Sequence, residues 1–598
     1  MDTQEHTTQT GGAFLVGATQ FSDIFIPEDF GEDADMVRTM VRDFVEQEIV
    51  PRQEAIEKQE AGVVEALLRK AAELGLLGAH MPEEYGGMEM DENLNTLISD
   101  GLGPAGSFTV AFGAHTGIGM LPILFFGTSE QKSHYLPRLI NGELKASYCL
   151  TEPGSGSDAL AARTRADLSD DSTYYILNGQ KMWITNAGFA NFFIVFAQVG
   201  GDKFTGFIVD GDSDGLTLGA EEDKMGIKGS STRQVFLENV KVPTDRVLGQ
   251  IGKGHHIAFN ALNIGRYKLG VMCLGGCKMS ATTAVRYANE RIQFKVPISS
   301  FGAIKYKLAE QAIRIFALDT AIYRVSGLLE AKNKALIESG SSYAEAKLSS
   351  AEEYAIECSI IKIAGSEILD YVVDETLQIH GGMGFSEEGT SARAYRDARI
   401  NRIYEGTNEI NRLLMVDQLF KRALKGRIDL IGPAWDVQKE LTSMPSMEKP
   451  SGTYGQEEKA IEEFRKALLM VAGGAAKMQM DGKLNLEEEQ EIVMNVADMM
   501  TDLFLAESLL MRVQRLHSLK DKPADQSIYD AILRVFLTDM TARVTKTGTD
   551  ALISFAEGDL LRTFLMGLKR FTKYPPTNIK TDRRLIADAL ISQKSYIL

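Results

Sequence analysis

The sequence has few cysteines, only two tryptophans and no long apolar run. Four cysteines in 598 residues form neither a disulfide framework nor a CxxC metal pair, and the eight histidines include no HExxH motif. The longest apolar runs, such as 121–126, are far shorter than the ~20 residues that a membrane span needs. These absences predict a protein of a reducing compartment that has no metal site and no transmembrane helix.

Positive charge is also scarce, because 82 acidic residues outnumber 64 basic residues and give a net charge of −18. A nucleic-acid surface needs clustered Lys and Arg, so we expect no nucleic-acid partner. The first residues carry Asp2 and Glu5 but no Lys or Arg, unlike a secretory signal or a basic transit peptide. We therefore expect a cytoplasmic protein of bacterial type, or a mitochondrial protein if a leader has been removed.

Changes of pattern along the chain predict an α+β protein with four domains. Helical periodicity in the first region is followed by short β-rich runs, and then by long amphipathic segments typical of a helix bundle. The Pro-, Ser- and Gly-rich stretch 442–456 indicates a linker. Further helices are expected after it at 457–480, 486–516, 525–543 and 550–569. The predicted domains are an N-terminal α-helical domain, a middle β domain, a helix bundle and a C-terminal helical extension, at 1–145, 146–255, 256–430 and 431–598.

Two segments of the β region are candidates for binding a cofactor. The first, 148–158 (YCLTEPGSGSD), has small residues and hydroxyls that let backbone N–H groups approach a phosphate, although such a turn is more often only a turn. The second, 178–186 (NGQKMWITN), carries Trp183 and Thr185. The indole is either a core aromatic or, together with Thr185, the border of a flat heteroaromatic ring. Two such segments in one small domain favour a cofactor surface.

These two segments resemble the flavin-contacting signatures of acyl-CoA dehydrogenases. Two further motifs follow in the order of that family: 378–384 (QIHGGMG) is similar to its QxxGGxG loop, and 402–412 (RIYEGTNEINR) to the loop with its catalytic glutamate. The resemblance implies an N-terminal helical domain, a middle β-barrel-like domain and a C-terminal helix bundle. It also implies FAD, bound between domains and across a subunit interface.

The resemblance implies a set of FAD contacts on this chain. Most lie in the four motifs, whereas Arg291 and Phe294 would contact the flavin of a neighbouring subunit. The sequence departs from the family pattern at Lys295, where glycine is usual, and at Phe301 and Gly302, where several relatives have a polar pair. The implied FAD-contacting residues are Tyr148, Leu150, Thr151, Gly156, Ser157, Trp183, Ile184, Thr185, Arg291, Phe294, Gln378, Gly381, Gly382, Thr407 and Glu409.

Oxidation of an acyl thioester between Cα and Cβ needs a base for the α-proton and an acceptor for the β-hydride. No ordinary side chain accepts hydride, so a cofactor must do so, and the resemblance implies flavin N5. A carboxylate in an apolar pocket has its pKa raised into the range of an effective base. The resemblance implies Glu405 in this role, against the alternative of a solvated loop carboxylate. Some relatives place the base on a bundle helix directly before an arginine, where this chain has Gly265.

Substrate contacts are also implied by the resemblance. The backbone N–H of Glu405 would donate to the thioester oxygen, and the glycine after it would permit close approach. The glycine-rich segment 112–119 either makes room for a long acyl chain or allows close helix packing. For two of the implied residues, Asn263 and Arg266, the alternative is a polar pair within the helix or between domains that does not contact substrate. The implied substrate-binding residues are Ser157, Asn263, Arg266 and Gly406.

The long extension after the glutamate loop resembles the very-long-chain type of this family, as does 300–304 (SFGAI). That likeness implies a homodimer that oxidises long-chain fatty acyl-CoA in β-oxidation and passes electrons to electron-transfer flavoprotein. Segment 561–573 mixes apolar and basic residues, which fits a weak peripheral membrane contact but favours a core-facing amphipathic helix. The alternative functions are an acyl-CoA oxidase, or a flavin-bearing assembly or scaffold protein with weak dehydrogenase activity.

Overall fold

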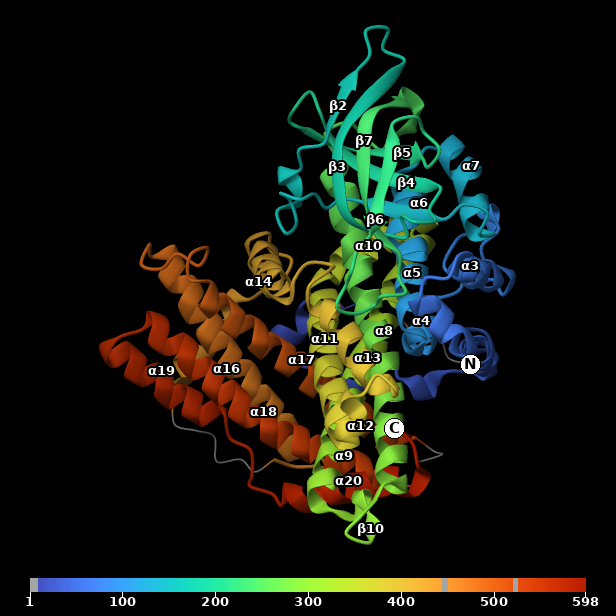
Figure 1. Cartoon of the computed structure of the whole chain (residues 1–598). Coiled ribbons are helices and arrows are strands. Elements are labelled where there is room, and N and C mark those ends of the chain that lie inside the picture. Colours follow the sequence, from blue (N-terminus) through green and yellow to red (C-terminus); the bar gives the residue numbers. More distant parts are fainter. Residues whose placement is uncertain (1–8, 442, 444–449, 520–524) are drawn as a thin grey trace.

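The computed structural model describes residues 9–441, 443, 450–519 and 525–598. A body of long helices carries a β domain at one end, the N-terminal helices on one side and the C-terminal helices on the other (Figure 1). The predicted α+β class and the predicted order of helical, β and helical regions are confirmed. Residues 1–8 of the expected leader, and 442 and 444–449 of the expected linker, lie outside the described residues.

Two of the N-terminal helices begin with a capping side chain. The Asp91 carboxylate accepts from the Leu94 N–H at the start of α4, and Thr128 forms a capping box with Gln131 at the start of α7. The apolar faces of the first helices enclose a common hydrophobic core. The helices are α1 (Glu32–Phe44), α2 (Gln53–Glu57), α3 (Val63–Glu73), α4 (Glu92–Leu102), α5 (Ser107–Gly113), α6 (Leu121–Phe126) and α7 (Ser129–Ile140).

A π-helical turn, η9 (Ala114–Gly119), joins α5 to α6. His115 fixes this turn, because its Nδ1 accepts from the Ala146 N–H at 3.1 Å and its Nε2 lies 3.0 Å from the Leu139 carbonyl oxygen. Contrary to the expectation from sequence, the run Ser107–Phe126 is long and apolar enough to cross a membrane by length and composition. Because 72% of its most apolar window is buried inside the protein, the run also has the character of a core helix.

The middle region forms an eight-stranded sheet in the order β6-β7-β3-β2-β4-β5-β8, with β1 beside β4. The strands β1 and β2 run parallel to β4, and all other neighbours in this sheet are antiparallel. Two register shifts let β3 and β7 pair over lengths well beyond the short runs expected from sequence. The strands are β1 (Ala146–Cys149), β2 (Arg165–Leu168), β3 (Tyr174–Thr185), β4 (Phe192–Val199), β5 (Lys203–Asp210), β6 (Leu216–Glu221), β7 (Thr232–Pro243) and β8 (Val247–Leu248).

The body is built around α8 and α11, which pack closely because glycines face each other. A Cβ at Gly270 would lie 2.5 Å from the Ile361 carbonyl oxygen, and a Cβ at Gly365 would lie 2.8 Å from the Gly270 Cα. A side chain at either position would push the two helices apart. The helices of the body are α8 (Gly254–Glu290), α9 (Gly302–Glu338), α10 (Tyr343–Glu353), α11 (Ala355–His380), α12 (Gly382–Phe385), α13 (Thr390–Ala398) and α14 (Asn408–Leu424).

The C-terminal extension is helical, as predicted, but its helix boundaries differ from the expected segments. The helix α18 continues through 544–549, where the pattern suggested a break, and Gly548 within it gives space to Leu568. The chain turns instead at Gly558, which has a φ of 56° that favours glycine. The last helix, α20, was not expected. The helices are α15 (Ile431–Leu441), α16 (Gly455–Met480), α17 (Gln490–Ser518), α18 (Gln526–Phe555), α19 (Gly558–Phe571) and α20 (Ile579–Gln593).

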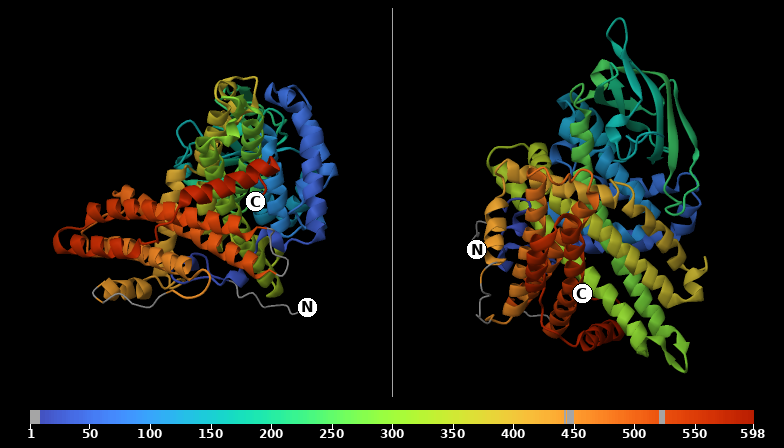
Figure 2. Two further views of the ribbon diagram at one scale, coloured as in Figure 1. Left: turned by 90° about the horizontal axis from the view of Figure 1, so that it is seen from below. Right: turned by 90° about the vertical axis from the view of Figure 1, so that its left-hand side faces the viewer.

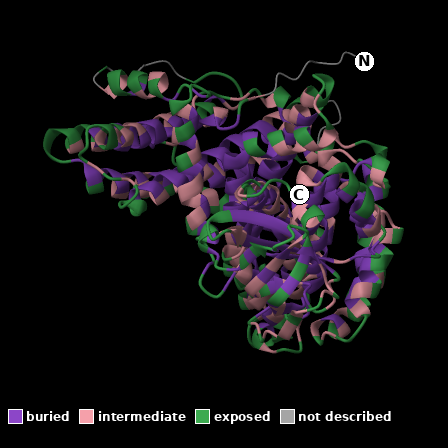
Figure 3. Cartoon of the chain, turned by 90° about the horizontal axis from the view of Figure 1, so that it is seen from above, coloured by how far each residue is buried: buried purple, intermediate pink, exposed green. Residues whose placement is uncertain are grey.

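The extension and the body share one hydrophobic core. The extension projects from the side of the body (Figure 2), and buried residues run along its helices as they do through the body (Figure 3). Within this core the Glu507 carboxylate accepts from Arg324 at 2.8 Å and from Arg465 at 2.6 Å. In α19 the side chains of Phe564 and Phe571 are buried, which supports the core-facing interpretation of that helix.

We predict that Glu507→Ala lowers the free energy of unfolding by about 3–5 kcal/mol, because it leaves two buried arginines without their carboxylate. Urea unfolding followed by circular dichroism measures the change. Glu491→Ala, at an exposed position on the same helix, is the matched control and is expected to change stability by about 0.5 kcal/mol or less. Equal midpoints for the two variants would contradict the role assigned to the buried pair.

Candidate active site

A cavity of about 950 Å³ lies where the N-terminal helices meet the body. One wall is α8, and α5, η9 and the turn after α4 form the opposite wall. The rest of the lining includes parts of α11 and α13 and residues from 50–58, 226–228 and 401–405. Of the residues predicted from sequence, Glu405 and Thr185 line this cavity. Small and apolar residues dominate the rest of the surface near them, as in pockets for organic ligands. They include Val110, Gly113, Gly117, Leu269 and Met272.

Glu405 lies in the loop before α14 and packs directly against Gly265 of α8. A Cβ at Gly265 would stand 2.5 Å from Glu405 Oε2, so only glycine leaves space for the carboxylate. The Oε2 atom is buried and has no hydrogen-bond partner among the described residues. Burial raises the pKa of Glu405 to about 7, although the positive charges of Arg266 and Lys362 act in the opposite direction. The carboxyl group is therefore poised to exchange a proton near neutral pH.

The backbone of this loop is held from three helices. Glu405 and Gly406 have φ values of 59° and 78°, a left-handed conformation that is unfavourable for glutamate. Lys362 Nζ donates to the Gly406 carbonyl at 2.8 Å, Asn411 Nδ2 donates to the same carbonyl at 2.8 Å, and Arg266 Nε donates to the Glu405 carbonyl at 3.3 Å. These contacts stabilise the unusual backbone conformation that directs the carboxylate toward α8.

Asn263 and Arg266, the predicted substrate contacts on α8, interact with each other. Arg266 Nη1 donates to Asn263 Oδ1 at 2.8 Å, and burial lowers the pKa of the guanidinium. The structure thus forms the polar pair that was the alternative interpretation of these residues. A contact of either residue with substrate stays a prediction.

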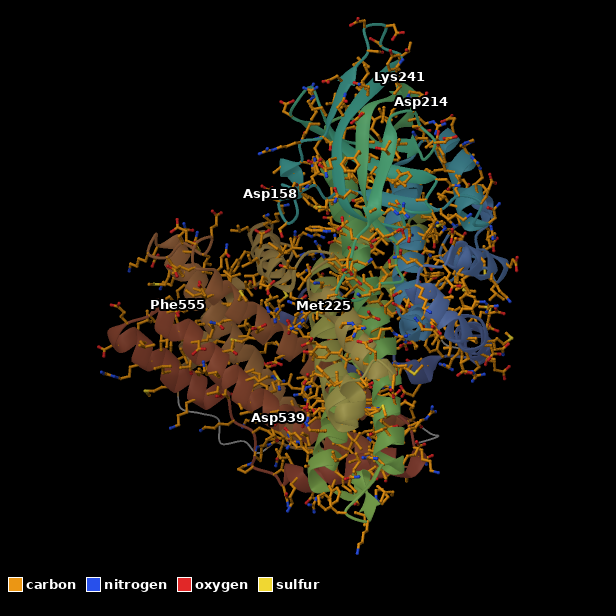
Figure 4. The ribbon with its side chains drawn as sticks, in the orientation of Figure 1. Asp158, Asp214, Met225, Lys241, Asp539 and Phe555 are labelled. Atoms are coloured by element: carbon orange, nitrogen blue, oxygen red, sulfur yellow. The ribbon has the colours of Figure 1, made fainter. Side chains whose placement is uncertain are left out.

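The two strand segments predicted to bind a cofactor lie together. The Met182 N–H donates to the Thr151 carbonyl at 2.9 Å, and the Ser147 hydroxyl donates to the Thr185 carbonyl at 2.8 Å. Behind them, Lys181 and Glu152 form a buried ion pair at 2.7 Å. Residues 151–158 (TEPGSGSD) lead away from β1, and Asp158 at the end of this segment lies at the edge of the β domain (Figure 4).

Trp183 is not a core aromatic, because the residue is 59% exposed. It has a φ of 57° at a register shift between β3 and β7, and such a bulge re-aims a side chain. Nothing lies within 4 Å of a Cβ built on Gly156, and the Tyr148 hydroxyl is buried without a partner among the described residues. An exposed indole, an open glycine loop and an unpaired hydroxyl within these segments fit a flat, phosphate-bearing ligand.

The other predicted FAD contacts in these strand segments and in the Glu405 loop differ in their exposure. Leu150 and Ile184 are buried in hydrophobic clusters, so their side chains do not face the surface. Ser157 and Glu409 are exposed, and the Thr407 hydroxyl caps α14 by accepting from the Ile410 N–H at 3.2 Å. All of these residues stay predicted ligand contacts.

Five predicted flavin contacts lie at the other end of the body: Arg291, Phe294, Gln378, Gly381 and Gly382. Arg291 follows α8 and Gly381 follows α11, and the two helix ends are joined by stacking of Tyr287 on His380 with ring centroids 4.1 Å apart. Arg291 lies about 39 Å along α8 from Gly265 at 1.5 Å per residue. Phe294 is 88% exposed, in the hairpin of β9 (Ile292–Gln293) and β10 (Val296–Pro297). These residues do not reach the Glu405 cavity of their own chain.

The glycine-rich segment serves both of the purposes considered from sequence. Gly117 lines the cavity, and nothing lies within 4 Å of a Cβ built on it. By contrast, a Cβ at Gly119 would lie 2.5 Å from that of Ala146, which makes this glycine a packing residue.

The sequence did not predict that Lys362 and Asn411 hold the Glu405 loop. A single lysine within the apolar run 360–364 (IIKIA) was the available signal for Lys362.

Models of acyl-CoA dehydrogenase domains match most of the chain. The N-terminal domain matches residues 31–143, the middle domain 147–240, and two C-terminal domain models match 252–420 and 463–570. A probable acyl-CoA dehydrogenase of Bacillus subtilis is 44% identical over 590 residues, which is 98% of each chain. The mitochondrial very long-chain specific acyl-CoA dehydrogenase of Homo sapiens is 37% identical over 426 residues, 69% of this chain and 60% of that protein.

A solved structure has the same architecture over the whole chain. The acyl-CoA dehydrogenase from Bacillus anthracis in complex with FAD is 43% identical and superposes with a TM-score of 0.95. The similarity covers 99% of this chain and 100% of that chain, so it includes the C-terminal extension.

We predict that Glu405→Gln stabilises the protein increasingly as the pH rises from 5 to 8. A carboxyl group with a raised pKa binds a proton in the folded state that the unfolded state has lost, so wild-type stability falls as pH rises toward 7. Glutamine has no such proton to lose, so the stability of the variant does not fall for this reason. Thermal unfolding of both proteins across that pH range gives the difference in midpoint.

Glu409→Gln is the control, because the Glu409 pKa is lowered by its own backbone N–H and by the Thr407 hydroxyl. The difference between its thermal unfolding midpoint and that of wild type should be constant between pH 5 and 8. A pH-independent offset for Glu405→Gln as well would show that the Glu405 pKa is not raised.

Proposed function

This chain belongs to the acyl-CoA dehydrogenase family, and on that premise we propose that it oxidises long-chain fatty acyl-CoA to the trans-2-enoyl thioester with Glu405 as the base. The family defines the class, an FAD-dependent oxidoreductase acting on CH–CH bonds. The observation that carries the choice of residue is the unpaired, buried Oε2 of Glu405 beside the cavity.

Glu405 would remove the α-proton of the thioester. Burial raises its pKa to about 7, so near neutral pH the carboxylate is present and is a stronger base than an exposed glutamate. Its position against Gly265 fixes the carboxylate on one wall of the cavity. FAD, when bound, supplies the acceptor for the hydride from the β-carbon. The features that fit this cofactor are the exposed Trp183, the open loop at Gly156 and the Thr185 side of the cavity.

Negative charge that develops on the thioester oxygen needs a hydrogen-bond donor. The Glu405 N–H has no hydrogen bond to another described residue, and it belongs to the loop that carries the base. Arg266 Nε donates to the Glu405 carbonyl, and Lys362 donates to the next carbonyl, so two cations hold the loop backbone. A donor fixed in this way requires little reorganisation during the reaction, which is the basis of oxyanion stabilisation.

A long acyl chain is supported by the shape of the cavity. The wall opposite α8 contains Gly113 and Gly117, and no atom occupies the position of a side chain at Gly117. Larger residues there would shorten the cavity. The similarity to very long-chain specific relatives points in the same direction.

The partners are also part of the proposal. An exposed Arg291 and Phe294, remote from the cavity of their own chain, support a homodimer in which they complete the flavin site of a second copy. Electron-transfer flavoprotein is the proposed electron acceptor, and β-oxidation the proposed process. All four cysteines are free and buried, which supports a reducing compartment such as the cytoplasm.

We predict that Glu405→Gln abolishes turnover, by at least about 1,000-fold, while it retains FAD. Purified protein is mixed with acyl-CoAs of graded length, and loss of the flavin absorbance and reduction of an artificial acceptor are followed. The wild-type rate should be highest with long acyl chains. Normal turnover of the variant would show that the base is misassigned, and a preference for short chains would refute the substrate proposal.

We also predict that two inactive variants restore activity when co-expressed. In a dimer with shared sites, a Glu405→Gln chain supplies an intact Arg291 to a partner whose Glu405 is intact but whose own Arg291 is replaced by alanine. One of the two sites in that heterodimer contains no substitution, so about half of the wild-type activity per heterodimer should return.

The control for this experiment is a chain carrying both substitutions, co-expressed with either single variant. No heterodimer then contains an intact site, and activity should stay at the level of the separate variants. Absence of rescue in the first mixture would mean that Arg291 does not act across a subunit interface.

A further inference from the structure

We propose that the C-terminal extension positions the loop of the catalytic base through a continuous chain of side-chain hydrogen bonds from α17. This inference rests on the proposed function of Glu405. The chain of contacts, here called the tail link, consists of Asp498, Arg412, Glu367, Asn408 and Lys362. It gives the extension a role in the reaction although none of the lining residues of the cavity belongs to the extension.

The outer half of the tail link joins the extension to the body. Arg412 of α14 donates from Nε to Asp498 Oδ1 at 2.7 Å, and its Nη1 and Nη2 lie 2.8 and 3.1 Å from the two carboxylate oxygens of Glu367. The Arg412 side chain is only 11% exposed, and both carboxylates raise its pKa. A planar guanidinium held by two carboxylates has little freedom to move.

The inner half of the tail link reaches the loop of the base. Asn408 Nδ2 donates to Glu367 Oε1 at 3.0 Å, and Asn408 Oδ1 accepts from Lys362 Nζ at 2.6 Å. Lys362 Nζ in turn donates to the Gly406 carbonyl at 2.8 Å. Asn408 is the first residue of α14 and lies three positions from Glu405. Every step from Asp498 to the loop backbone is therefore a direct hydrogen bond.

The loop needs such support because its backbone is strained. A left-handed conformation is unfavourable for a residue other than glycine, and Glu405 adopts it with a φ of 59°. The surrounding contacts must outweigh that preference for the carboxylate to stay against Gly265. If the Lys362 contact with Gly406 weakens, the carboxylate moves away from the position required for proton transfer. Such a movement lowers kcat while it leaves the distant parts of the binding cavity unchanged.

The extension stays docked without the tail link, which makes the proposal testable. Arg512 of α17 donates to Asp319 of α9 at 2.5 Å, and Glu507 pairs with Arg324 of α9, so two other buried contacts hold α17 on the body. The Asp502–Arg543 pair offers a matched control. Asp502 lies one helical turn after Asp498 and binds Arg543 at 2.8 Å, but that pair joins α17 to α18 within the extension.

The experiment compares Asp498→Ala with Asp502→Ala as FAD-loaded, full-length proteins. Steady-state kcat and KM for a long-chain acyl-CoA are measured with an artificial acceptor, together with the rate of flavin absorbance loss in a single turnover. We expect Asp498→Ala to lower kcat and the single-turnover rate roughly tenfold, with KM within about twofold of wild type. Asp502→Ala should keep wild-type rates. Arg412→Lys should lose less activity than Arg412→Met, because an ammonium keeps one of the two ion pairs.

Equal rates for Asp498→Ala and Asp502→Ala, whether both normal or both reduced, would overturn the inference. This comparison uses no Arg412 variant, so poor folding of an Arg412 variant does not affect it. Glu405→Gln is assayed in parallel, so that failure of the proposed base can be distinguished from failure of the tail link. An active Glu405→Gln refutes the proposed base, whereas an inactive Glu405→Gln beside a normal Asp498→Ala refutes only the tail link.

Discussion

The carboxylate of Glu405 held without a partner against Gly265 is the constraint on which the rest of the site depends. It requires glycine on α8, because a Cβ there would come within 2.5 Å of Oε2. It requires a left-handed backbone at Glu405 and three donors that hold the adjoining carbonyls. Burial raises the carboxyl pKa to about 7 and so converts an ordinary glutamate into a base suited to neutral pH.

The long helix α8 connects this local constraint to the whole molecule. Gly265 and Arg266 contact the Glu405 loop, and the next turns of α8 line the cavity. Gly270 allows close packing of α11, and Arg291 follows the end of α8 at the far end of the body. The extension belongs to the same structure, because its helices share the core of the body and its buried Arg512 binds the Asp319 carboxylate of α9. A substitution in the extension therefore has a physical route to the reaction.

The sequence predicted the features that depend on local pattern. The order of domains and the two candidate strand segments were readable from residue types and spacing, whereas Glu405 was identified through the resemblance of its loop to a family motif. Lys362 and Asn411 were not, because their contact with the loop arises only when α11 and α14 fold together. Gly117 and Gly119 show the same limit: the pattern identified a glycine-rich turn, but only its neighbours determine which glycine opens the cavity and which permits close packing.

The central claim is that Glu405 removes the α-proton, and exchange of that proton with solvent tests it most directly. A long-chain acyl-CoA with sulfur in place of the β-carbon cannot lose a β-hydride, so proton removal is observed alone. The FAD-loaded protein is incubated with this compound in D2O, and the α-hydrogen signal is followed by NMR. The account predicts rapid exchange with wild type, slower as the pH falls below about 7, and none with Glu405→Gln. Exchange by Glu405→Gln at the wild-type rate would contradict it.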